Sequence, residues 1–110
     1  MLDKTISELE ERIEKADSIT DDERSALLKL IGELKVEITT LSKTHEEEAN
    51  SIAGFTQIAA HEALRQERNP GLFKIAQDGL DKSVEEFELT HPTLVNTIRE
   101  ISDVLSNLGI

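Results

Sequence analysis

Hydrophobic residues recur along this chain at the spacing of a helix face. In the first stripe the intervals are four, three, four and three residues, and its members are Leu2, Ile6, Leu9, Ile13 and Ala16. The second stripe repeats these intervals with Leu27, Ile31, Leu34, Ile38 and Leu41. Such spacing places each set along one side of an α-helix. The two predicted helices are therefore expected to fold back on each other, antiparallel, through a short turn.

The segment between these two stripes carries the signals of a helix start. Thr20 and Glu23 match a capping box, in which each side chain accepts a hydrogen bond from the backbone of the other residue. Asp21 and Asp22 place negative charge near the positive end of the helix dipole. A helix is therefore predicted to begin at about residue 21.

The stretch over residues 42–51 is polar apart from Ala49, and it has two interpretations. Thr44 and Glu47 match a second capping box, which predicts the start of a new helix. No Pro or Gly in this stretch forces a turn, however, so we favour one long central helix over residues 21–67. At about 1.5 Å per residue, this helix is expected to be about 70 Å long.

Two further helices are predicted in the second half of the chain. Asn69 and Pro70 fit the cap and the first position of a helix whose stripe is Phe73, Ala76, Leu80, Val84 and Phe87. The residue before Pro92 avoids the helical region, so Thr90 or His91 is expected to cap the last helix. Its stripe is Leu94, Ile98, Ile101, Leu105 and Leu108. Gly109 is then expected to adopt the left-handed conformation after a helix end, with Ile110 touching Leu105.

Composition and charge narrow the possible functions of this chain. Its 110 residues suit a single domain over residues 1–110, and Phe55, Phe73 and Phe87 are its only aromatic residues. Residues 1–50 carry 14 acidic and 7 basic side chains, and residues 51–110 carry 9 and 5, for a net charge of −11. We therefore expect neither nucleic-acid binding nor attraction to anionic lipid. The absence of Cys, of a signal-peptide pattern and of a long apolar run predicts a cytoplasmic protein with no membrane span.

The end of the chain resembles a known family. Phe87 and Glu88, the sequence THPTL at residues 90–94 and the sequence LSNLGI at residues 105–110 carry the resemblance. They are similar to a family of short bacterial helical proteins catalogued only as a domain of unknown function. The resemblance covers residues 84–110 in detail and residues 1–45 in composition. It implies an all-helical cytoplasmic protein, with no activity or site residues to transfer.

The three histidines are the only candidates for metal chemistry. His45 and Glu48, like Glu88 and His91, are three residues apart, but a di-iron bundle needs two Glu-x-x-His motifs and two more glutamates. Only Glu88–His91 has the right order, and a predicted helix break separates its two residues. His61 lacks the second histidine of a metalloprotease motif, and we expect it to pair with Arg65 instead of binding metal. No metal site and no cofactor are therefore predicted.

Catalytic signals are absent as well. The hydroxyl residues lie at predicted caps or on helix faces, with no base beside them to activate a nucleophile. The glycines are isolated, so there is no phosphate-binding loop. Gly32 and Gly54 would fall about 40° apart around one continuous helix, and so on the same face. This placement is explained equally well by chance and by the close approach of another helix.

The sequence therefore predicts an all-α protein made of helical hairpins in a coiled-coil-like bundle. A monomer is expected to leave the polar stretch and much of the stripes in contact with water, so we expect a homodimer or homotetramer. The function that fits best is a non-enzymatic structural or protein–protein interaction module that self-associates. The alternatives are a small helical metal- or ligand-binding protein built on His45, His61 and His91, or a partner-binding regulator or chaperone.

Overall fold

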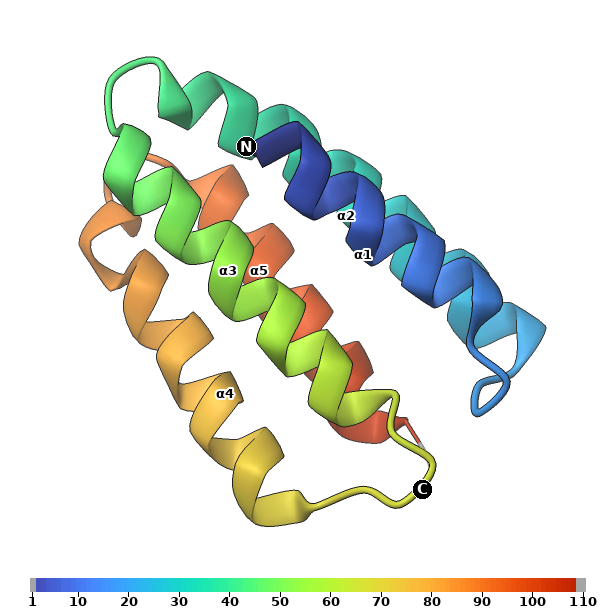
Figure 1. Cartoon of the computed structure of the whole chain (residues 1–110). Helices are drawn as coiled ribbons and strands as arrows, with labels where there is room; N and C mark the ends of the chain where they lie inside the picture. Colours follow the sequence, from blue (N-terminus) through green and yellow to red (C-terminus); the bar gives the residue numbers. More distant parts are fainter. Residues whose placement is uncertain (1, 109–110) are drawn as a thin grey trace.

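The computed structural model describes residues 2–108 and is all-α, as predicted. Its helices are α1 (Leu2–Lys15), α2 (Asp21–Ser42), α3 (Glu46–Ala63), α4 (Pro70–Val84) and α5 (Pro92–Asn107), with a single 3-10 turn, η1 (Glu85–Phe87), between the last two. Each helix runs back along the one before it, so the chain rises and falls through the bundle (Figure 1). None of the helices in the described part of the chain is long and apolar enough to cross a membrane.

Helix α3 contacts each of the other four helices. On one side α1 packs against both α2 and α3, and on the other side α4 packs against both α3 and α5. Helices α2 and α5, far apart in the sequence, pack against each other and complete the bundle. The two outer helices, α1 and α4, therefore lie on different sides of the molecule (Figure 1).

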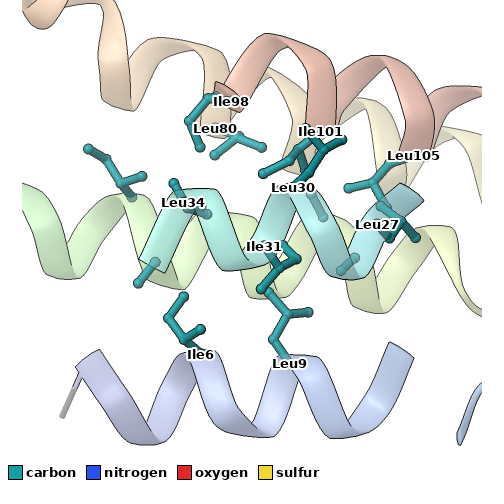
Figure 2. Packing of buried hydrophobic residues seen from close by; sticks show 14 of the residues in the cluster. Ile6, Leu9, Leu27, Leu30, Ile31, Leu34, Leu80, Ile98, Ile101 and Leu105 are labelled. Carbon is teal, nitrogen blue, oxygen red and sulfur yellow. The ribbon is translucent and has the colours of Figure 1, made fainter. Parts of the chain in front are cut away.

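The hydrophobic stripes meet in one core inside the single chain. Figure 2 shows Ile31 of α2 directed toward Leu9 of α1, while Leu30 is directed toward Ile101 of α5. Every α-helix contributes at least one residue that is 0% exposed, among them Leu9, Leu34, Ile52, Leu80 and Ile98. The prediction that a monomer leaves these stripes in contact with water is therefore wrong. The reason is that five short helices can cover one another's hydrophobic stripes. The predicted hairpins, which share one long helix, would leave parts of these stripes uncovered.

The predicted long helix over residues 21–67 is also wrong, because the chain turns after Ser42. The bundle is only 37 Å in its longest dimension, about half the length expected of that helix. The backbone N–H of His45 donates to Leu41 O at 2.8 Å, which closes the turn without Gly or Pro. Turning here allows Ala49 and Ile52 to fold back into the core, where both are 0% exposed. Burial of this apolar surface favours two helices over one.

The predicted helix caps at Thr20 and Asn69 are confirmed, whereas His91 precedes α5 as predicted but makes no side-chain cap bond. Glu23 N–H donates to Thr20 Oγ1 at 3.1 Å, and Thr20 N–H donates to Glu23 Oε1 at 2.9 Å. Asn69 Oδ1 accepts from Leu72 N–H at 3.1 Å, with Pro70 at the first helical position. The second capping box is wrong, since His45 and not Thr44 precedes α3 and makes no side-chain cap bond.

The end of α5 is held by a side chain that the sequence did not point to. The guanidinium of Arg68 donates to Leu105 O at 3.1 Å and to Leu108 O. It thereby satisfies carbonyl groups that a helix end leaves free. The predicted left-handed cap at Gly109 and the contact of Ile110 lie outside the described residues.

The glycine prediction also changes with the fold. Gly32 and Gly54 lie on separate helices, α2 and α3, so they share no helix face. A Cβ added at either position meets nothing within 4 Å among the described residues. The close approach of another helix therefore does not occur at these two positions within the chain.

Candidate functional site

The fold brings two of the three histidines together at one end of the bundle. His45 precedes α3 and His91 precedes α5, and their ring centroids are 6.2 Å apart. The ring of Phe87 lies 5.4 Å from each, and all three rings meet edge to face. Phe87 is buried and both histidines are half-buried. The three rings therefore pack the α2–α3 turn against the α4–α5 turn.

The two turns have the same local structure. His45 N–H donates to Leu41 O and His91 N–H donates to Phe87 O, both at 2.8 Å. In each turn the preceding threonine places its Oγ1 next to the histidine Nδ1, at 2.8 Å for Thr44 and 2.9 Å for Thr90. Thr44, His45 and Asn50 of THEEEAN recur as Thr90, His91 and Asn96 of THPTLVN, a likeness that the sequence reasoning missed, so the two turns share these residues at the same spacing.

This ring cluster lacks the further ligands that a metal site needs. Within residues 2–108, no three His, Cys, Asp or Glu side chains come close enough together to hold a metal ion. Glu88 Oε1 accepts from Arg99 at 2.7 Å, so its carboxylate is held by α5. The cluster is best interpreted as packing between the two turns.

The third histidine lies far along α3 from this cluster, beside a buried carboxylate. Glu62 is 9% exposed, and its Oε2 is 3.9 Å from His61 Nε2. Arg65 Nε approaches Glu62 Oε1 at 3.4 Å, so its ion pair is with Glu62 and not with His61 as predicted. Arg65 Nε is close enough to Glu62 Oε1 for an ion pair, but the geometry is not that of a hydrogen bond. In the described part of the chain, Glu62 Oε1 therefore accepts no hydrogen bond.

A groove between α4 and α5 contains a carboxyl group whose pKa is shifted. Asp81 lies there with Gln77, Arg99 and Asp103. Partial burial, followed by repulsion from Asp78, raises the pKa of the Asp81 carboxyl above its usual value. Ser102 also lines this groove, but within residues 2–108 its Oγ accepts from Gln77 Nε2 at 2.8 Å and is not paired with a carboxylate. The groove therefore does not have the paired nucleophile and base of an active site.

The most distinctive surface is the outer side of α3 and α4. Four large apolar side chains are exposed there: Phe55 (37%), Ile58 (51%), Leu72 (43%) and Ile75 (69%). They belong to two helix stripes that we call the α3–α4 face. Its members are Ser51, Phe55, Ile58 and Glu62 of α3 and Arg65 just past its end, with Leu72, Ile75, Gly79 and Lys82 of α4 and Glu86 just past its end. The intervals alternate between four and three residues, so each set follows one side of its helix.

The two helices of this face meet where the ring of Phe55 on α3 lies against Gly79 on α4. A Cβ added to Gly79 would come to 2.5 Å from Phe55 Cε1, so the ring would have to move aside for any larger residue. Because the helices are antiparallel, the next turn of each brings Ile58 and Ile75 to the same level. The four apolar residues therefore lie on the same outer side of α3 and α4, in a strip whose member Ile58 also borders a groove beside α1.

Comparison with known proteins identifies the family. A family model described as a domain of unknown function, DUF4404, matches residues 2–110. The chain belongs to this family. The match confirms the resemblance recognised in the THPTL and LSNLGI segments and extends it over nearly the whole chain. No curated protein and no solved structure matches the chain.

Sequence reasoning missed the exposed strip of this DUF4404 domain for a simple reason. Each of its stripes contains only two large apolar residues among polar ones, so neither has the pattern of a core face. The close packing at Gly79 could not be predicted either, because it depends on which helix lies beside α3. The signal of this surface in the sequence was a pair of apolar residues three positions apart on each of two successive helices, Phe55 and Ile58 on the first and Leu72 and Ile75 on the second.

Proposed function

We propose that this DUF4404 domain is a non-enzymatic, cytoplasmic protein–protein interaction module that self-associates through its α3–α4 face. The observation that carries this proposal is that Phe55, Ile58, Leu72 and Ile75 are all exposed on the outer side of two neighbouring helices. Adjoining exposed apolar side chains on a small protein are typical of a contact surface. Covering the strip with a second copy removes it from water.

The rest of the bundle surface supports this choice of face. The other exposed large apolar residues of the described chain are Val36 on α2 and Leu89 in a turn, which lie on different elements from the strip. Single apolar residues on a surface are ordinary and indicate no partner. The alternative metal- or ligand-binding function is less well supported, because His61 lies away from the cluster of His45 and His91.

Sedimentation equilibrium of the purified chain tests self-association. A face two helices wide and about 25 Å long has a projected area of about 500 Å² per copy, which is small for a dimer interface. The measurement should therefore extend from about 1 μM to about 1 mM. We expect the mass to rise from 12.3 kDa to at least twice that value. A folded chain that stays monomeric over the whole range contradicts the proposal.

A further inference from the structure

The two ends of the α3–α4 face differ in charge and shape. At one end, α3 and α4 border a hollow of about 480 Å³ whose lining residues include Glu47, Glu48 and Glu86. The ring of Phe55, 37% exposed, also lines this hollow. Lys82 is the only basic residue among the lining residues, so the hollow has an excess of negative charge.

Arg65 lies at the opposite end of the same face. Its side chain is 42% exposed, and its ion pair with Glu62 is a loose one at 3.4 Å. A guanidinium can bind carboxylates through several N–H groups and can also stack on an aromatic ring. The hollow at the other end of the face offers both kinds of group, but it is too far away for Arg65 of the same chain.

Arg65 and the hollow lie at equal distances along the chain from Ile58, on opposite sides of it. Arg65 is seven residues after Ile58, and Ser51, which lines the hollow, is seven residues before it. Seven residues are close to two full turns and about 10 Å, so Ser51 and Ile58 lie on one side of α3. Arg65 lies just past the end of the helix, and its contact with Glu62 keeps its side chain near that side. A two-fold axis that crosses α3 at Ile58 therefore brings Arg65 of one copy to the level of Ser51 in the other.

We infer that the partner of the α3–α4 face is a second copy in an antiparallel, two-fold arrangement, with Arg65 of each copy seated in the acidic hollow of the other. This inference rests on the proposed self-association and specifies its geometry. Ile58 meets Ile58 of the second copy at the axis, and α4 lies on α4 of the second copy near Ile75. The interface is closed, because a two-fold axis uses the same patch on both copies.

Charge selects this arrangement over the parallel one. In a parallel pair the three glutamates of one hollow would face the same three glutamates of the second copy, and like charges at an interface oppose association. In the antiparallel pair each hollow receives a guanidinium instead. The charged ends therefore set the direction of the helices, while the apolar strip supplies the contact area.

Disulfide trapping tests the direction, because the natural chain contains no cysteine. Three single variants are needed: Ile58→Cys at the axis, and Ser51→Cys and Arg65→Cys on either side of it. A disulfide requires Cα atoms within about 7 Å of each other. In the antiparallel dimer, two copies of Ser51→Cys would hold their thiols about 20 Å apart.

We expect Ile58→Cys to form a covalent dimer with itself under mild oxidation. Ser51→Cys and Arg65→Cys should each stay largely monomeric when oxidised alone, and should give at least about tenfold more mixed dimer when combined. Efficient self-crosslinking of Ser51→Cys, with no gain on mixing, overturns the antiparallel arrangement. The sedimentation mass of the natural chain distinguishes failure of the antiparallel arrangement from failure of self-association. A dimer with the wrong crosslinks refutes only the antiparallel arrangement. A monomer refutes self-association itself.

Discussion

Replacing Leu34 by alanine should lower the free energy of unfolding by about 2–5 kcal/mol, the usual range for a fully buried leucine. Leu34 is 0% exposed and lies in the core shared by α1, α2 and α5 (Figure 2). Removing its side chain leaves a cavity that close-packed neighbours cannot fill. A domain of this size is stable by only about 5–15 kcal/mol, so urea denaturation followed by circular dichroism should resolve the change easily.

The matched control for this variant is Val36→Ala. Val36 lies two residues along the same helix but is 68% exposed, so its truncation should change the free energy of unfolding by no more than about 0.5 kcal/mol. Equal unfolding midpoints for the two variants would show that the stripes are not closed inside one chain. The bundle described here requires a large difference.

Replacing Ile75 by glutamate should raise the dissociation constant of the dimer by at least about 100-fold. Ile75 is 69% exposed in the single chain and lies at the centre of the proposed interface on α4. Two copies of the new carboxylate would lose water on association without gaining a partner. Because the residue is exposed before association, the circular dichroism spectrum and the unfolding midpoint of the dilute variant should stay those of the natural chain.

Val36→Glu is the control for the interface, since Val36 has nearly the same exposure, 68%, on the α2 surface. Its dimer should dissociate at the same concentration as that of the natural chain in sedimentation equilibrium. If both glutamate variants weaken the dimer alike, added negative charge on a chain of net charge −11 is the cause, and the α3–α4 face is not the interface.

Local patterns were enough to predict the all-α fold and most helix starts. The intervals of the four stripes depend only on helix geometry, and the caps at Thr20 and Asn69 depend only on neighbouring residues. The turn at residues 43–45 is different, because this polar stretch is compatible with either a helix or a break. The choice is made by distant residues, which bury Ala49 and Ile52 only if the chain turns back.

The ring cluster and the α3–α4 face could not be predicted without knowing which helices lie side by side. His45 and His91 each looked like an isolated histidine in the sequence, and only the packing of one turn on the other places their rings 6.2 Å apart. The α3–α4 face likewise exists because α4 lies beside α3 with Gly79 under Phe55. The expected self-association was derived from exposed core stripes, which the fold buries, and it is now proposed for a different surface.

A dilution series of ¹⁵N–¹H correlation spectra locates the contact surface most directly. If the α3–α4 face binds a second copy, the amide signals of Ile58 and Ile75 should shift with protein concentration, while that of Val36 on α2 should not. Shifts confined to α2, or no shifts between about 10 μM and about 1 mM, would contradict self-association through this face.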